Sequence, residues 1–240
     1  MKLLTIVLLL ICISLIVSVV VCYFKKDHFS YDENKEVYRL GDIINNFAIC
    51  KKDNCKSWSL DLKKIQKDYP ESIGAEYIKK SKKRYDIDTL LNIIKNKNLL
   101  NKNLNYVAIH IRTGDVLCVE GKDKWMSRRG ILDYNRMYNK IKQYYKKFNI
   151  PKDTKVKIFS FFHKDHYTKQ YDKNNCIENK SIEYLNNIQR LLREDGINDV
   201  NVYTNRFPDQ DIIDCINAKY FIPSAGNFSG IILNLRKKIY

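Results

Sequence analysis

The pattern of apolar and polar residues changes at residue 103. Beyond that point, four short apolar runs typical of strands alternate with amphipathic patterns typical of helices. The strand patterns cover residues 105–111, 155–162, 199–205 and 219–226, and the helical patterns cover residues 131–148, 181–196, 208–218 and 228–240. Because strands that alternate with helices form parallel sheets with right-handed crossovers, we predict an α/β, Rossmann-like domain over residues 104–240.

Three residues mark expected helix ends in this domain. Ser181 is a candidate N-cap of the second helix, and Gly196 is the expected stop signal of the same helix. Pro208 suits the first turn of the third helix, because that position needs no backbone N–H donor.

The chain before residue 104 has a different pattern. Residues 25–45 begin as a polar segment, which we interpret as a tether, and the stretch from residue 37, "VYRLGDIINNFAICKKDNCKSW", begins to look folded. Between residues 59 and 98, apolar residues recur at spacings of three and four, a pattern that is typical of helices. We therefore expect a small, mainly helical subdomain over residues 46–103, ahead of the Rossmann-like domain.

The N-terminus carries an apolar run over residues 3–24 that contains no charged residue and is followed by Lys25 and Lys26. It is long enough to cross a bilayer as a helix, and longer than the apolar core of a cleaved signal peptide. We expect residues 1–24 to be an uncleaved transmembrane signal-anchor, with a cleaved signal peptide as the alternative. The expected topology is a single-pass type II membrane protein with its body in the lumen of the secretory pathway.

Charge and cysteine content narrow the picture further. The formal net charge is +16, but the lysines are scattered among asparagines, which favours a solvated surface over a nucleic-acid site. Of the seven cysteines, Cys50 and Cys55 are close enough in sequence to close a small disulfide loop. We expect the remaining body cysteines to be buried or free, namely Cys118, Cys176 and Cys215.

The candidate chemistry lies at the carboxyl ends of the predicted strands, where open α/β sheets bind ligands. His110 and Arg112 are two residues apart at the end of the first strand and point to the same face. Gly114 and Asp115 suit the turn that follows. An arginine guanidinium is well shaped to grip a phosphate.

Another candidate follows the fourth strand, where "SAGNFSG" opens the last helix. A helix N-terminus offers backbone N–H groups and the positive end of a dipole to an anion. A plain N-cap at Asn227 or Ser229 is the alternative. Asn179 and Asn227 also begin glycosylation sequons, and Asn179 is the more plausible acceptor because Asn227 falls in the candidate site.

These two stretches resemble a known group of enzymes. "HIRTGD" (110–115) resembles the His-x-Arg-x-Gly-Asp motif of the α-1,2-, α-1,6- and protein O-fucosyltransferases, and "FIPSAGNFSGII" (221–232) is similar to a later motif of that group. In that group the unit between the motifs is the donor half of a GT-B-type fold, which binds GDP-fucose without a metal. The resemblance therefore implies a GDP-sugar as donor substrate and no other cofactor.

The resemblance also implies roles for individual residues. Arg112 would hold the β-phosphate with help from Ser224 or Ser229, and Asp211 or Asp214 would lie near the guanine. For some acceptors such a transfer also needs a general base, and His110 and His163 are the strand-end histidines available for that role. His110 and Arg112 are therefore the expected catalytic residues. The donor-binding residues expected in full are Arg112, Gly114, Asp115, His163, Asp211, Ser224, Asn227, Phe228 and Ser229.

The sequence thus predicts a membrane-anchored, metal-independent glycosyltransferase that moves a sugar from a nucleoside-diphosphate donor to a glycan or protein acceptor. Fucose is the first guess for the sugar. One alternative is a degenerate, membrane-anchored module that binds a glycan or nucleotide without catalysis. Another is a metal-dependent GT-A-type transferase, because "DQD" (209–211) matches its Asp-x-Asp motif; we prefer to interpret these acids as the start of a helix. The sequence contains no "GxxxxGK", "GxGxxG" or "GxSxG" motif, which disfavours nucleotide hydrolysis, dinucleotide redox chemistry and serine hydrolysis.

Overall fold

The computed structural model describes residues 38–45, 62–118, 132–162 and 175–240. The expected anchor at residues 3–24, the "CKKDNC" cysteines and His163 all lie outside the described residues. Within the described ranges, none of the helices combines the length and the apolar character that a membrane crossing requires.

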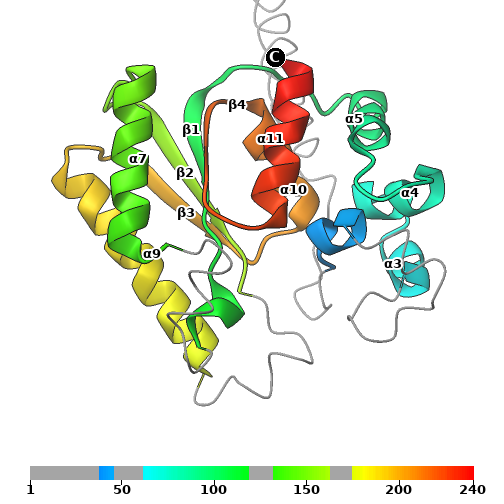
Figure 1. Ribbon diagram of the computed structural model, residues 1–240, viewed down its shortest axis with the longest axis horizontal. Coiled ribbons are helices and arrows are strands. Elements are labelled where there is room, and N and C mark those ends of the chain that lie inside the picture. Colours follow the sequence, from blue (N-terminus) through cyan, green and yellow to red (C-terminus); the bar gives the residue numbers. More distant parts are fainter. Residues whose placement is uncertain (1–37, 46–61, 119–131, 163–174) are drawn as a thin grey trace, which may run out of the picture. The chain divides into compact units, whose positions relative to one another are not determined.

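The core of the fold is a four-stranded parallel sheet (Figure 1). Its strands are β1 (Leu104–His110), β2 (Lys155–Ser160), β3 (Val200–Thr204) and β4 (Ala218–Pro223), in the spatial order β3-β2-β1-β4. Every neighbouring pair is parallel. The predicted α/β fold with a parallel sheet is confirmed, and each strand begins within one residue of its predicted start.

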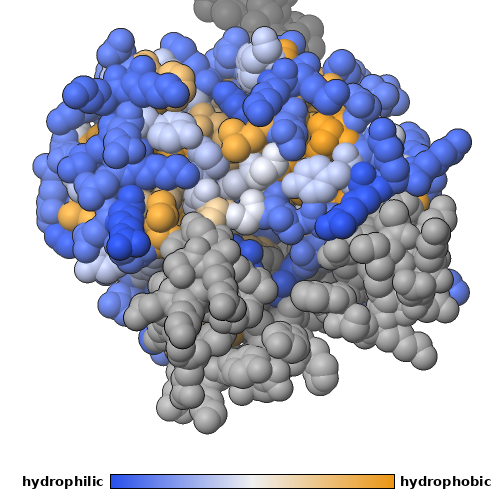
Figure 2. Space-filling model, viewed as in Figure 1, coloured by the Kyte–Doolittle hydropathy of each residue, from blue (hydrophilic) through white to orange (hydrophobic). Residues whose placement is uncertain are grey.

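Helices cover both faces of this sheet. Helices α7 (Tyr134–Phe148) and α9 (Cys176–Glu194) lie on one face, and α10 (Pro208–Asn217) and α11 (Asn227–Ile239) lie on the other (Figure 1). Alternate β1 residues separate the two layers, since Val107 and Ile109 join the apolar core with α7 and α9, whereas His110 contacts α11. The surface in the same view is mostly hydrophilic, with small hydrophobic areas between the helices (Figure 2).

The helix ends agree with the sequence in two places and differ in two. Pro208 is the first residue of α10, and Gly196, with φ +84°, follows the end of α9. Ser181 is not an N-cap, because α9 begins earlier, at Cys176, and Ser181 lies buried inside the helix. The N-cap of α11 is Gly226, so Asn227 is the first helical residue rather than the cap.

The region before the sheet is helical, as predicted, with α3 (Leu62–Asp68), α4 (Ile73–Lys80) and α5 (Ile87–Asn96). The expected tether over residues 25–45 needs correction at its end. Residues 40–45 are helical, and Leu40, Ile43 and Ile44 are completely buried or nearly so. The hydrophobic burial of these side chains makes residues 38–45 part of the core. All described residues belong to one compact unit.

Asp209, at the start of α10, ties this region to the sheet. Its carboxylate accepts hydrogen bonds from the Tyr38 hydroxyl (2.5 Å) and the Ile73 backbone N–H (2.6 Å). Tyr38 also packs edge-on against Tyr69 and Phe207, with ring centroids 5.6 and 5.3 Å apart. Burial of the Asp209 carboxyl raises its pKa from the ordinary 3.8 to about 6. The first Asp of "DQD" therefore stabilises the packing of residues 38 and 73 against the start of α10.

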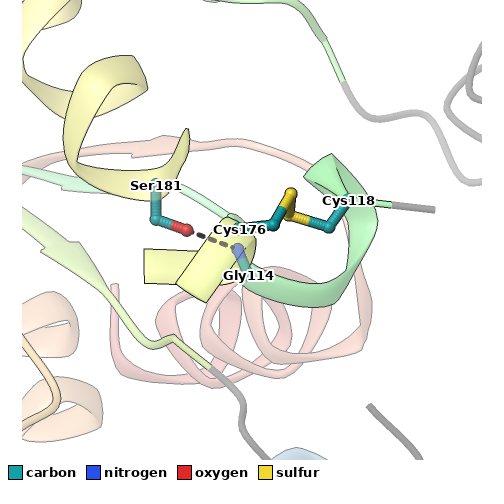
Figure 3. Close-up of a disulfide and its surroundings, with 4 residues drawn as sticks. All are labelled: Gly114, Cys118, Cys176 and Ser181. Atoms are coloured by element: carbon teal, nitrogen blue, oxygen red, sulfur yellow. Dashed lines mark hydrogen bonds between the residues drawn. A yellow bond between two sulfur atoms is a disulfide. The ribbon is translucent and has the colours of Figure 1, made fainter. Parts of the chain in front are cut away.

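Two of the body cysteines are paired, contrary to the expectation that they would be buried or free. A disulfide joins Cys118, just after the 3-10 helix η1 (Gly114–Leu117), to Cys176 at the start of α9 (Figure 3). No spacing signal in the sequence marks this pair, whose members are separated by 58 residues. Cys215 is buried and free, as predicted.

Candidate functional site

The candidate site lies where the carboxyl ends of β1 and β4 meet. In the order β3-β2-β1-β4, the chain first adds strands on one side of β1 and then crosses to the other. The two strand ends are joined by a hydrogen bond from the Ser224 N–H to the His110 carbonyl, at 2.9 Å. Open α/β sheets bind ligands in the crevice at such a switch point.

A pocket opens at this edge of the sheet. It is bounded by the ends of β1 and β2, by the starts of α10 and α11, and by the segment before the helical region. Its lining residues are Tyr38, Arg39, Leu40, Gly41, Asp42, His110, Ile111, Arg112, Phe161, Pro208, Asp211, Ala225, Gly226, Asn227 and Phe228. The pocket therefore brings together residues from both sequence motifs that suggested a ligand.

Arg112 lines the pocket, and its side chain rests on Gly226. A Cβ atom added at Gly226 would lie 3.3 Å from both Cδ and Nη1 of Arg112. Gly226 also has φ +96°, a backbone conformation that only glycine adopts without strain. The glycine in the late motif thus makes room for the arginine of the early motif, which links the two stretches physically.

His110 lies beside Arg112 and contacts the first turn of α11. Its Nδ1 is 2.8 Å from the Ser229 hydroxyl, and its ring packs against Phe228 with centroids 5.0 Å apart. Burial, and secondarily the Arg112 charge, lower the pKa of His110 from 6.5 to about 3. His110 is therefore neutral at physiological pH and is a weak base.

The start of α11 forms the neighbouring part of the pocket. Asn227 is exposed and Phe228 is half-buried, and both line the pocket. The N-cap Gly226 provides no side-chain hydrogen bond to the helix, so the backbone N–H groups of the first turn are the donors at this end. Ser229 is buried and contacts His110, which makes it a support for the histidine.

Other predicted donor-binding residues hold the backbone around Arg112. The Ser224 hydroxyl accepts a hydrogen bond from the Arg112 N–H at 3.0 Å. Gly114 is buried, and its N–H donates to the Ser181 hydroxyl at 3.0 Å. Neither Ser224 nor Gly114 lines the pocket. The structure does not describe the Asp115 side chain.

Asp211 lines the pocket from the first turn of α10. The Arg206 guanidinium donates to it at 3.0 Å and to Asp214 at 2.6 Å, and stacks over the ring of Tyr203. Burial raises the pKa of the Asp211 carboxyl from 3.8 to about 7, although Arg206 acts in the opposite direction. A carboxyl with a strongly perturbed pKa in a cleft is a functional candidate.

The two acids of "DQD" accept hydrogen bonds from different residues. Asp209 accepts from Tyr38 and Ile73, whereas Asp211 accepts from Arg206. Both lie in the first turn of α10, which agrees with their interpretation as helix-start acids. Across the described ranges, no group of three or more His, Cys, Asp or Glu side chains is arranged to hold a metal ion.

One wall of the pocket was not expected from the sequence. Residues 38–42 fall within the predicted tether, but all five line the pocket, and Gly41 packs against Phe228. Arg39 and Asp42 form an ion pair at 3.7 Å within this segment. The available signal was the "LGD" triplet at residues 40–42, a Gly-Asp pair like the one that follows Arg112.

No protein-family model matches the chain, and neither a curated protein nor a solved structure matches it.

Proposed function

We propose that this chain is a membrane-anchored glycosyltransferase that transfers a sugar from a nucleoside-diphosphate donor without a metal. GDP-fucose is the first choice of donor, and a glycan or a protein is the acceptor. The observation that carries the proposal is the pocket beyond the carboxyl ends of β1 and β2, in which the Arg112 side chain and the start of α11 lie together.

The chemistry of this pocket suits a diphosphate. A guanidinium offers paired donors to phosphate oxygens, and a helix N-terminus adds backbone N–H groups and the positive end of its dipole. Arg112 and α11 supply these two elements at one place, with Gly226 allowing them to approach closely. In the proposed reaction the acceptor oxygen bonds to the sugar carbon as the bond to the diphosphate oxygen breaks. The electron pair leaves with the diphosphate, whose charge Arg112 stabilises, and the proton of the acceptor hydroxyl passes to the departing diphosphate or to water.

Asp211 is the proposed contact for the base. A carboxylate that faces guanine accepts hydrogen bonds from the ring N–H and the amino group. Asp211 lines the same pocket as Arg112, and Arg206 favours the ionised, accepting form of its carboxyl against the opposite effect of burial. A carboxylate at this position favours GDP over nucleotides whose bases do not carry a ring N–H next to an amino group.

His110 is better suited to support the donor than to remove a proton. With a pKa of about 3, it accepts a proton poorly at neutral pH, and its Nδ1 already meets Ser229. This observation favours a second candidate function, a membrane-anchored module that binds the nucleotide or a glycan without catalysis. The two candidates share the diphosphate site and differ in turnover.

The proposed location is the lumen of the secretory pathway, with residues 3–24 as the anchor. The Cys118–Cys176 disulfide supports it, because stable disulfides belong mainly to oxidising compartments. Asn179 is exposed on α9, which is compatible with its proposed glycosylation.

The test is GDP binding to the full chain in detergent or nanodiscs, measured by calorimetry with EDTA present. We expect binding that survives EDTA and is lost in Arg112→Ala. Arg136→Ala is the matched control, because Arg136 is an exposed arginine whose partner is Asp133. Absence of GDP binding, or binding that requires a divalent metal, would contradict the proposal; the latter result would favour the GT-A alternative.

A panel of sugar nucleotides then separates the two candidate functions. Slow hydrolysis of one donor identifies the sugar without knowledge of the acceptor. We expect GDP-fucose to be hydrolysed faster than UDP-sugars. GDP binding without hydrolysis or transfer of any donor would favour the binding module.

A further inference from the structure

The backbone that carries Arg112 continues beyond the end of β1. The Ile111 N–H still donates to the Phe159 carbonyl at 2.9 Å, as the next residue of a strand would. The following residues, Arg112 to Gly114, lie past the strand end and lead into η1. Their position depends on contacts made by side chains from other elements.

Three serine hydroxyls hold these three consecutive residues. The Arg112 N–H donates to Ser224 Oγ after β4, at 3.0 Å. Thr113 Oγ1 shares a hydrogen bond of 2.7 Å with Ser160 Oγ at the end of β2. The Gly114 N–H donates to Ser181 Oγ on α9, at 3.0 Å. Each contact comes from a different element, so together they hold the segment from several directions.

Ser181 differs from the other two serines because it belongs to a helix and not to a strand end. It is completely buried within α9, and its hydroxyl meets a buried N–H. A buried backbone N–H without a partner is costly, so this bond favours one position of Gly114. The Cys118–Cys176 disulfide joins the same two elements, η1 and α9, next to the hydrogen bond (Figure 3).

We propose that Ser181 is a positioning residue that acts on Arg112 through Gly114 and so sets the affinity of the site for the diphosphate. The inference rests on the proposed function. Arg112 lies two residues from Gly114, and its side chain has a defined seat against Gly226. Phosphate recognition by a guanidinium depends strongly on geometry, and small displacements of a positioned group weaken its effect. Ser181 does not touch the ligand.

The experiment compares GDP with guanosine on the full chain. Guanosine lacks the phosphates, so the ratio of the two affinities reports the diphosphate contacts alone. We expect Ser181→Ala to weaken GDP binding roughly 5- to 30-fold, the effect of losing one buried hydrogen bond, and to leave guanosine binding unchanged. Ser181→Thr, which keeps a hydroxyl at this position, restores most of the GDP affinity.

The matched control is Ser81→Ala, which removes another buried serine hydroxyl, at the end of α4. It leaves the ratio of GDP to guanosine affinity unchanged. Ser181→Cys is the alternative variant if Ser181→Ala does not fold, because a thiol keeps the side-chain shape but accepts a hydrogen bond only weakly from the Gly114 N–H; the same selective loss of GDP affinity is expected.

The outcomes separate this inference from the proposed function. GDP binding that Ser181→Ala leaves unchanged, or that falls in step with guanosine binding, overturns the positioning role alone. If the unaltered chain does not bind GDP, the proposed function fails, and the positioning role fails with it.

Discussion

The pocket has two walls of very different origin. One wall consists of the strand end at His110 and Arg112 and the start of α11 at Ala225 to Phe228. The other consists of residues 38–42, which precede the helical region. Strand-end motifs mark the first wall in the sequence, whereas residues 38–42 lie at the end of the predicted tether, where the chain begins to look folded, and carry no motif that suggests a site. The difference shows that a short segment outside the recognisable motifs can form one wall of a pocket when a few of its apolar side chains are buried in the core.

The anchoring of residues 38–45 explains why this wall belongs to the fold. Leu40, Ile43 and Ile44 are buried, and the Ile44 carbonyl accepts a hydrogen bond from the Tyr85 N–H at 3.0 Å. Tyr38 adds its hydrogen bond to Asp209. The apolar residues from residue 37 onward suggest a folded stretch, but they extend over too short a length to show that it packs into the core beside the pocket.

The largest expected effect tests whether residues 38–45 really belong to the core. Ile44→Ala should lower the free energy of unfolding by about 2–5 kcal/mol, because it leaves a cavity at a fully buried site. The measurement is urea denaturation of the full chain in detergent, followed by circular dichroism.

The control for this substitution is Ile182→Ala on α9. Ile182 is 42% exposed, so the same change should alter the free energy of unfolding by about 0.5 kcal/mol or less. Equal effects of the two substitutions would mean that residues 38–45 are a tether after all.

The next effect compares one glycine from each wall. Gly226→Ala should cost about 1–3 kcal/mol, because Gly226 occupies a backbone region that alanine avoids. Its new Cβ would also press on the Arg112 side chain, so GDP affinity should fall with it. Thermal unfolding and calorimetry measure the two consequences.

Gly41→Ala is the matched substitution on the other wall. The atoms nearest to its new Cβ belong to Phe228 and lie 3.7 Å away, an ordinary contact. We expect little change in stability or GDP affinity. A loss of GDP affinity equal to that of Gly226→Ala would show that both walls position the ligand equally.

The last expected effect is the pH dependence of the link between residues 38–42 and α10. Burial raises the pKa of Asp209 to about 6 in the folded chain, so the folded state holds this proton more tightly than the unfolded state. The contribution of Asp209 to stability is therefore complete below about pH 4 and is lost as the pH rises through about 6. The expected loss is on the order of 3 kcal/mol.

Urea denaturation between about pH 4 and 7 measures this dependence. Asp209→Asn should remove the part of the fall in stability that Asp209 causes, and the part that Asp211 causes should remain. Asp88→Asn is the control with the opposite sign, because Lys238 lowers the pKa of the exposed Asp88. The stability that Asp88 contributes is lost as the pH falls. An unchanged slope in Asp209→Asn would contradict the buried, protonated state of Asp209.

Much of the fold was predictable because its signals are local. The alternation of strand and helix patterns identified all four strands of the sheet, and Pro208 marked the start of α10. The start of α9 was not predictable from Ser181, since the serine hydroxyl is used by Gly114 in another element. The Cys118–Cys176 pair was likewise hidden by its long separation in sequence.

The candidate site likewise contains residues that the sequence placed correctly and residues whose contacts only the structure showed. The sequence pointed to His110, Arg112, Asp211, Asn227 and Phe228, and the structure brings all five to one pocket. Three further residues were expected to bind the donor, but they support the backbone or His110, namely Ser224, Gly114 and Ser229. Which residues of a motif face the pocket depends on the partners around them, and these partners come from distant parts of the chain.

By itself, the sequence determined the parallel α/β fold and the strand ends that carry the candidate chemistry. Both follow from the local periodicity of apolar residues and from the geometry of parallel sheets. Only the tertiary structure decided that residues 38–42 close the pocket, that Gly226 seats Arg112, and that Ser181 holds Gly114. These contacts join residues far apart in the chain, and whether each one forms depends on how the helices and the sheet pack together.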